Sequence, residues 1–383
     1  MGTYFLSHLH ALGGGIVSYI IPFLFVLSLV VFFHELGHFL VARWCGVKIL
    51  AFSIGFGPEI IGFNDRHGTR WKIAAIPLGG YVKFLGDENA ASMPDSTELA
   101  GMTEADRAHS FAFQSVFKRA AIVVAGPMAN FLLAVVIFAA MFMFYGKQTM
   151  SARVDTVQPE SAAATAGFEP GDLVLAINGH RIDTFSEMQR IVSESPGEPL
   201  QVTVDRKGTQ LVLKATPELR TQKDAFGNEY RIGVLGIQRS VMADDIKYEP
   251  VSFPNAVWLG TQETWRIIDQ TMGYIGGVIA GRKSADQVGG PIRIAQLSGQ
   301  AATLGFQFLI HLAAVLSVSI GLLNLFPVPL LDGGHLLFYA IEALRGRPLS
   351  ERAQEVGFRI GLAIVLMLMI FATFNDIVHL TTS

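Results

Sequence analysis

The residues with the clearest chemical potential are His34, Glu35 and His38, which spell HELGH. On an α-helix, side chains four positions apart lie on one face, so the two histidines can bind one metal ion together. The glutamate between them then lies beside the metal, where it can act as a general base. This spacing predicts hydrolysis assisted by a tetrahedral zinc ion.

The surroundings of this pattern weigh against a chance occurrence, which is the alternative for any five-residue motif. HELGH lies in a stretch of apolar residues, about 16–42, that is long enough to cross a bilayer. Ionisable groups at that depth are costly to desolvate, and they usually face a bundle interior or a water-filled cavity. We therefore expect a zinc peptidase that works within the membrane.

The composition also indicates a membrane protein. Of the 383 residues, 51% are hydrophobic and only 16% are charged. The net charge is −3 and no long run of one sign occurs, so charge gives no reason to expect nucleic acid as a partner. The single cysteine, Cys45, excludes an intramolecular disulfide and is either a passive thiol or a further metal ligand.

Four apolar segments predict four membrane-spanning helices, at about 16–42, 120–145, 306–331 and 360–374. The first Lys or Arg is Arg43, so the first segment lacks the basic start of a signal peptide and should remain as an anchor. Basic residues follow the first segment, precede the second and lie between the third and fourth. Because such loops tend to stay inside, the amino terminus and the 147–300 segment are predicted to lie outside the cytoplasm.

A catalytic zinc ion usually takes three protein ligands and leaves a fourth position for water. The best candidate for the missing ligand is Asp332, in NLFPVPLLDGGH. Prolines interrupt a helix and paired glycines permit close backbone approach, so this carboxylate can be directed at a distant site. The alternative is that LDGG only ends a helix with an Asx turn.

These motifs together resemble a known family. HELGH in a first span, GPMANF in a second, one PDZ-like module and NLFPVPLLDGGH are similar to the site-2 protease family of intramembrane zinc metalloproteases, closest to the bacterial regulator-of-sigma-E type. The resemblance covers almost the whole chain. It implies Zn2+ bound by His34, His38 and Asp332, with Glu35 as the catalytic acid/base.

The resemblance also implies two substrate-positioning asparagines. Asn324 occupies the family asparagine of the NxFP motif, and Asn130 belongs to the second-span GPxxN pattern with Gly126 and Pro127. The chain departs from many relatives at Ser319, where they carry an asparagine. A serine hydroxyl is shorter and offers one donor, so no catalytic role is assigned to it.

For function, the resemblance implies regulated intramembrane proteolysis of single-span transmembrane substrates of the anti-sigma-factor type, and possible clearing of remnant signal peptides. It implies a multi-pass protein in the lipid bilayer of the bacterial inner (cytoplasmic) membrane, with the active site toward the cytoplasm and the PDZ-like domain in the periplasm. A competing hypothesis is a catalytically silent membrane scaffold that binds peptide tails. A transporter is disfavoured because no internal repeat is evident. The sequence identifies neither the substrate nor the oligomeric state.

Three regions between the spans carry further expectations. Residues 49–86 combine recurring glycines with β-forming runs and predict short hairpins. The resemblance makes this a re-entrant element whose edge could hold an unwound substrate; a hairpin without a substrate role is the alternative. The PDZ-like region 150–240 either captures peptides or excludes bulky substrates. Residues 250–300 are weakly amphipathic and are expected on the outer membrane surface.

The expected fold class is a polytopic α-helical membrane protein with a re-entrant β element and an inserted extracytoplasmic PDZ-like α+β domain. The predicted order is a first transmembrane helix with HELGH in 1–48, the β element in 49–86, a solvated cytoplasmic loop in 87–117, a second transmembrane helix in 118–146, the PDZ-like domain in 150–240, the membrane-surface segment in 250–300, a third transmembrane helix with LDGG in 306–332 and a fourth in 356–376.

Overall fold

The computed structural model describes residues 2–87, 99, 101–223, 229–239, 246–281 and 289–382. These residues divide into two compact units. The first unit consists of Met1–Ala140, Val257–Met272 and Ala285–Ser383, and the second of Met141–Ala256 and Gly273–Ser284. The second unit is therefore inserted into the chain of the first.

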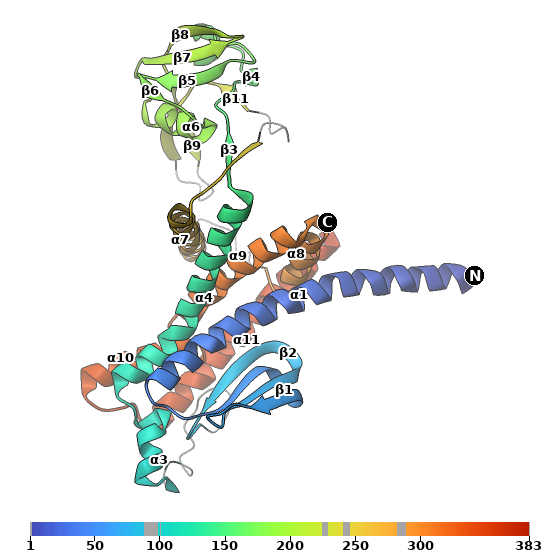
Figure 1. Ribbon diagram of the computed structural model, residues 1–383, viewed down its shortest axis with the longest axis vertical. Coiled ribbons are helices and arrows are strands. Elements are labelled where there is room, and N and C mark those ends of the chain that lie inside the picture. Colours follow the sequence, from blue (N-terminus) through green and yellow to red (C-terminus); the bar gives the residue numbers. More distant parts are fainter. Residues whose placement is uncertain are drawn as a thin grey trace. The chain divides into compact units, whose positions relative to one another are not determined.

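The first unit is mainly helical (Figure 1). Its helices are α1 (Gly2–Trp44), α3 (Glu104–His109), α4 (Val116–Tyr145), the middle of α7 (Phe253–Ile279), α8 (Pro291–Leu304), α9 (Phe306–Asn324), α10 (Asp332–Arg345) and α11 (Glu351–Thr382). In the described residues, four helical segments are long and apolar enough to cross a membrane: Val17–Trp44, Val116–Tyr145, Phe306–Asn324 and Arg352–Val378. The prediction of a polytopic helical membrane protein is confirmed.

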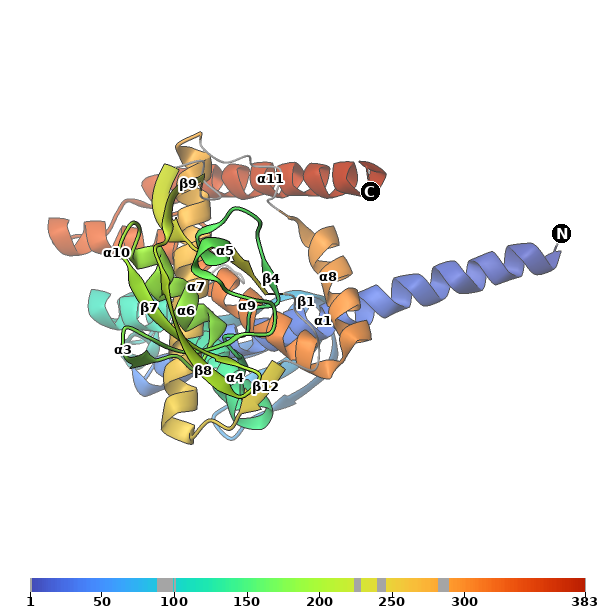
Figure 2. The same cartoon turned by 90° about the horizontal axis from the view of Figure 1, so that it is seen from above.

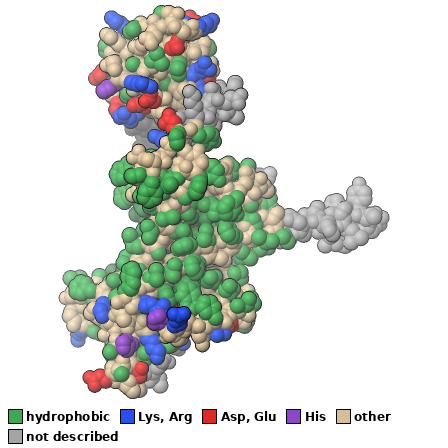
Figure 3. All heavy atoms as spheres, in the orientation of Figure 1, with side chains coloured by type: hydrophobic (Ala, Val, Ile, Leu, Met, Phe, Trp, Pro, Cys, Tyr) green, Lys and Arg blue, Asp and Glu red, His purple; other side chains and the backbone are tan. Residues whose placement is uncertain are grey.

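Hydrophobic side chains cover much of the surface of these helices, whereas Lys, Arg and His gather near the end of α1 (Figure 3). A helix that is apolar all round is stable only inside a protein or a membrane. Two of these helices, α1 and α4, approach closely because Gly37 has no side chain. A Cβ at Gly37 would overlap the Ala125 carbonyl, so the small residue sets the helix contact.

The third membrane helix ends earlier than the predicted range 306–332. α9 stops at Asn324, and Asp332 begins the separate helix α10. Between them lie Pro327 and Pro329. A proline has no backbone N–H and its ring clashes with the preceding turn, so a helix does not continue through the pair. The LDGG motif consequently starts a new helix.

The β element consists of two long strands, β1 (Ile49–Asn64) and β2 (Arg70–Phe84). The two strands pair as four shorter segments, and each segment pairs with the next one in space. Their spatial order is 59–64, 70–74, 49–54 and 80–84. This arrangement replaces the predicted short hairpins with one hairpin that bends and pairs with itself. Figure 1 shows it alongside the second half of α1, with which both strands are in contact.

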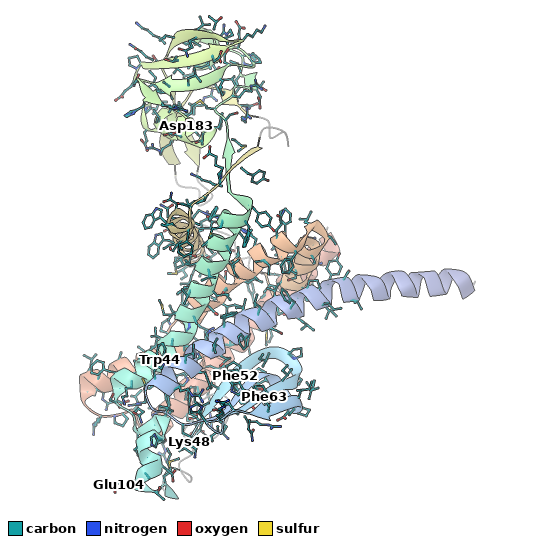
Figure 4. All side chains as sticks on the ribbon, in the orientation of Figure 1. Trp44, Lys48, Phe52, Phe63, Glu104 and Asp183 are labelled. Carbon is teal, nitrogen blue, oxygen red and sulfur yellow. The ribbon has the colours of Figure 1, made fainter. Side chains whose placement is uncertain are left out.

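The base of this hairpin is an aromatic cluster. Phe52 is fully buried, and its ring stacks on Trp71 with a centroid separation of 4.3 Å. Phe32 and Phe39 of α1 meet Phe52 edge to face. Figure 4 labels Phe52 between α1 and the hairpin, and Phe63 nearer the outside. These contacts fix the hairpin to the helix that carries HELGH.

The segments predicted as a loop and as a surface region are partly helical. Within 87–117 the structure places α3, capped by Thr103, and a 3₁₀ turn at Phe111–Phe113, while residues 88–98 and 100 lie outside the described part. Within 250–300 it places α7 and α8. Figure 2 shows α8 against α1, where it is in contact. Their location on a membrane surface stays a prediction.

The second unit is an α+β domain with its own core, at the predicted position 150–240. Its helices are α5 (Ala162–Ala166) and α6 (Phe185–Glu194), and its strands are β3 (Lys147–Met150), β4 (Thr156–Val157), β5 (Leu173–Ile177), β6 (His180–Arg181), β7 (Leu200–Arg206), β8 (Thr209–Ala215), β9 (Glu218–Lys223), β10 (Glu229–Val234), β11 (Ile237–Gln238) and β12 (Ile246–Glu249). The unit contains an antiparallel sheet of order β6-β5-β7-β8 and the separate two-stranded pairs β9–β10, β4–β11 and β3–β12. Apolar residues alternate along β7, so Leu200, Val202 and Val204 enter the core.

Candidate active site

The two histidines of α1 and the aspartate that begins α10 meet in the first unit, although they are far apart in the sequence. Asp332 Oδ2 lies 3.2 Å from His34 Nε2 and 3.5 Å from His38 Nε2. The two Nε2 atoms are 3.3 Å apart. The structure thus brings together the three residues predicted as metal ligands, as one group with metal-binding geometry.

These separations fit a zinc ion. Zinc bonds of about 2.0–2.1 Å in a tetrahedron hold the ligand atoms about 3.3 Å apart, close to the three separations measured between Asp332, His34 and His38. Asp332 Oδ2 is also buried without a hydrogen-bond partner in the part of the chain that the structure describes. A buried polar atom of this kind needs a partner, which a cation between the three side chains supplies.

A backbone carbonyl orients His38. The Nδ1 atom of His38 lies 2.9 Å from the Ile122 carbonyl oxygen on α4. Because a carbonyl only accepts hydrogen bonds, Nδ1 carries the proton and Nε2 presents its lone pair to the metal position. Partners of this kind fix the tautomer and direction of a ligating imidazole.

An amide side chain performs the same task for His34. Asn130 on α4 is fully buried, and its amide nitrogen lies 3.2 Å from His34 Nδ1. Its Oδ1 atom has no hydrogen-bond partner among the described residues. The two ends of an amide are assigned by their partners. With the amide turned over, His34 Nδ1–H donates to Asn130 Oδ1, and His34 Nε2 presents its lone pair to the metal position.

The predicted general base lies on the wall of a cavity of about 560 Å³ that also contains the three candidate ligands. Glu35 shares this wall with Asn324 and with residues 79–82 of β2. The Val82 backbone lies close to the Glu35 carboxylate. Gly80 permits this contact, because a Cβ there would lie 2.9 Å from Glu35 Cγ. The segment 80–84 therefore runs directly beside the proposed catalytic carboxylate.

Glycines of the two sequence motifs make room for the ligands. A Cβ at Gly126, in GPMANF, would overlap the His38 imidazole. A Cβ at Gly333, in LDGGH, would overlap the carbonyl groups of Leu325 and Phe326. The turn before α10 is also strained, since Leu330 has a φ of 99°. Only small residues at these positions allow α4 and α10 to approach the metal site.

Four other residues considered from the sequence are not members of the ligand group. Asn130 contacts His34 and is absent from the described cavity lining, so its predicted contact with substrate stays untested. The Ser319 hydroxyl donates to the Val315 carbonyl of its own helix at 3.0 Å. His335 lines the cavity, with its ring against Phe358. Cys45 does not belong to the metal-binding group found among the described residues.

Sequence reasoning missed two contributors, Ile122 and Val82. Both act through their backbone, and every residue type offers a carbonyl oxygen and all but proline an N–H. No side-chain pattern could therefore have pointed to them. The packing of β2 beside α1 depends on the folded chain, and this packing places the Val82 backbone near Glu35.

Comparison with known proteins gives a family match over nearly the whole chain. The family model described as Peptidase family M50 matches residues 22–368. A protein of Agrobacterium fabrum that carries the name "Putative zinc metalloprotease" is 54% identical over 364 residues, covering 95% of this chain and 97% of that protein.

Two further similarities were found. Metalloprotease MmpA of Caulobacter vibrioides is 41% identical over 387 aligned residues, covering 95% of this chain and 96% of its own. Among solved structures, the HtrA3 PDZ domain bound to a phage-derived ligand matches 19% of this chain and 86% of that chain, at 23% identity and a TM-score of 0.15.

Proposed function

The chain belongs to peptidase family M50 and is a zinc metalloprotease, and we propose that it hydrolyses peptide bonds of single-span membrane proteins inside the bilayer. The observation that carries this proposal is the position of the ligand group. His34 and His38 lie within Val17–Trp44, a helical segment apolar enough to cross a membrane, and Asp332 meets them there. A water-activating site at that depth is suited to substrates that are themselves in the membrane.

In the proposed mechanism, His34, His38 and Asp332 hold the zinc ion. When bound, zinc lowers the pKa of water to about 7 and polarises the scissile carbonyl. Glu35 accepts the proton of the attacking water and returns it to the leaving amine. The position of Glu35 in the lining of the cavity that contains the three candidate ligands supports this role.

The substrate backbone needs its own support during cleavage. A helical membrane segment has all its backbone groups paired internally, so the peptide bond becomes accessible only after local unwinding. The 80–84 segment of β2 lines the cavity and pairs on one side with 49–54. We infer that the unwound substrate adds to this strand, with Asn324 as a further hydrogen-bonding group. Helix-breaking residues near the cut should then favour cleavage.

We propose that Asn130 positions the imidazole of His34. Its contact with His34 supports an effect on zinc binding through this ligand, in addition to the substrate contact that the family resemblance implies.

The PDZ-like domain offers a groove of about 170 Å³ between α6 and the 232–237 segment. An apolar groove between a helix and a strand suits an extended peptide, which supports capture of a peptide by this domain. Exclusion of substrates with bulky outer domains is the alternative role.

The biological setting is proposed from the family resemblance. It is regulated intramembrane proteolysis in the bacterial inner membrane, with anti-sigma-factor-type proteins and remnant signal peptides as substrates. The active site would face the cytoplasm and the PDZ-like domain the periplasm. The basic residues Arg43 and Lys48 directly after the first span support this orientation.

The test uses the purified full-length protein in detergent. Bound zinc is quantified, and cleavage of a single-span model substrate is followed for wild type, Glu35→Gln and Asp332→Ala. We expect about one zinc per chain in wild type and Glu35→Gln, less in Asp332→Ala, and cleavage by wild type alone. His34→Ala should also lose zinc, and His180→Ala, at an exposed histidine of the second unit, is its matched control and should keep zinc and cleavage.

Two results would count against the proposal. Robust cleavage by Glu35→Gln would show that Glu35 is not the catalytic acid/base. A wild-type protein that is folded but neither binds zinc nor cleaves would favour the scaffold hypothesis.

A further inference from the structure

The first unit has a second cavity that the proposed proteolysis does not use. It has a volume of about 380 Å³ and is lined by Arg43 and residues 46–49, where α1 leaves its membrane-spanning segment. Its floor contains the buried side chains of Val47 and Ile49. Four basic side chains line it as well: Arg43, Lys48, His67 and His109. The cavity therefore combines an apolar base with a basic surround.

Hydrogen bonds between three chain segments hold this cavity in shape. Arg43 at the end of α1 forms an ion pair of 2.9 Å with Asp65 in the β1–β2 turn. His109 Nδ1 donates to the Gly46 carbonyl at 2.9 Å, and the Lys48 backbone N–H donates to the His109 carbonyl at 2.9 Å. The basic side chains thus lie on a preformed frame, which lowers the entropic cost of binding a ligand.

The cavity keeps an excess of positive charge. Asp65 balances Arg43, and hydrogen bonds from Thr69, Arg43 and His67 outweigh its burial and lower the pKa of this carboxyl to about 2. Lys48 is exposed and has no ion pair within the described residues. Arg43 uses one guanidinium nitrogen for Asp65, so its remaining N–H groups are available for a second acceptor. An anion is the ligand that these charges favour.

The neighbouring surface points to an amphiphilic anion. Trp44 is 81% exposed and Leu40 is 41% exposed, one helical turn apart on α1. Exposed tryptophan at the end of a membrane span is typical of the headgroup level of a bilayer. Figure 4 labels Trp44 and Lys48 in this region, and Figure 3 shows basic side chains gathered below the hydrophobic surface. A small water-soluble phosphate would use neither the apolar floor nor this surface.

We propose that the cavity binds the phosphate headgroup of an anionic phospholipid from the leaflet at which α1 ends. Lys48 and Arg43 hold the phosphate by charge-assisted hydrogen bonds, and an acyl chain lies along Leu40 and Trp44. The bound lipid joins the end of α1, the helix that carries Glu35, to the turn of the β1–β2 hairpin, whose second strand lines the active-site cavity. Lipid composition would then influence the stability of the hairpin beside the active site.

The test counts lipids bound to the full-length protein in non-ionic detergent by native mass spectrometry. The probes are phosphatidylglycerol and phosphatidylcholine with the same acyl chains. We expect wild type to retain phosphatidylglycerol preferentially and Lys48→Gln to reduce its binding about fivefold, the effect of removing one interfacial charge. Lys48→Arg should restore binding, because it keeps the charge.

Arg347→Gln is the matched control, since this arginine is exposed and lies outside the cavity lining. It should leave phosphatidylglycerol binding unchanged, and an equal loss in this variant would show general surface attraction in place of a site. Equal retention of both lipids, or wild-type binding by Lys48→Gln, would also overturn the proposal. Displacement of phosphatidylglycerol by an equal concentration of inorganic phosphate would reassign the cavity to a free anion.

Discussion

Gly126 lies directly against the imidazole of His38, so that a Cβ at this glycine would overlap the ring at Nε2. Gly126→Ala should therefore displace the proposed metal ligand His38 while favouring the helix itself, because alanine has the higher helix propensity. We expect zinc affinity to fall by about 10-fold to 100-fold, the effect usually seen when the surroundings of a ligand are disturbed. Competition with a zinc chelator measures this change.

The control for this substitution is Gly276→Ala on α7. A Cβ at Gly276 meets no atom within 4 Å. The same chemical change there should leave zinc affinity and cleavage at wild-type values. If the zinc affinity of Gly126→Ala equalled that of Gly276→Ala, the close contact between Gly126 and His38 would not matter for zinc binding.

Asn130→Ala should weaken zinc binding because His34 loses the partner of its Nδ1 atom. About a 10-fold loss is expected. Asn130→Asp retains an oxygen acceptor and should recover most of the affinity. A raised KM with unchanged zinc affinity in Asn130→Ala would instead favour the substrate contact implied by the family resemblance.

Phe52→Ala should detach the hairpin from α1. Phe52 is 1% exposed and stacks on Trp71, and truncating such a side chain costs about 3–5 kcal/mol. Hydrogen exchange of residues 49–84 should accelerate and cleavage should decline, since β2 lines the active-site cavity. Phe63→Ala is the control, because Phe63 is 62% exposed although it also stacks on Trp71. Equal exchange in the two variants would contradict this account.

The stability of the second unit should depend on Asp172 at acidic pH. Burial raises the pKa of this carboxyl, but hydrogen bonds from Arg206 and the Glu169 N–H outweigh it and leave the pKa below the usual value. A depressed pKa means that the stabilisation is present above the unfolded value of about 3.9 and is lost as the pH falls through the folded value. The unit should loosen below about pH 4.

Hydrogen exchange of β5 and β7 in the full-length protein, corrected for the intrinsic rate at each pH, measures this effect. Asp172→Asn should flatten the pH dependence. Asp183→Asn serves as the control, because the ion pair of Asp183 with Arg181 is exposed. If Asp172→Asn kept the wild-type pH dependence of hydrogen exchange, Asp172 would not be its cause.

The sequence predicted the spans, the inserted domain and the ligand group because each has a strong local signal. Apolar length reveals a span, and the i, i+4 spacing of His34 and His38 places both on one helix face. Asp332 could be identified as a candidate ligand because prolines and glycines surround it in the sequence. The end of α9 was placed too late because apolar residues continue past Asn324, whereas the prolines end the helix.

Other features depend on contacts between distant segments. The four-segment pairing of the hairpin follows from the bending of β1 and β2, and local alternation of residues does not encode which segment pairs with which. The contact of Asn130 with His34 depends on the packing of α4 against α1. Motif spacing identified Asn130 but could not name its partner.

The separation of Asp332 from α9 has a consequence for the synthesis of the protein. The proposed third ligand begins α10, whereas the two histidines lie on α1. In a nascent chain, HELGH would therefore lack this ligand until α10 has been translated. The proposed metal site would stay incomplete while the earlier segments are inserted.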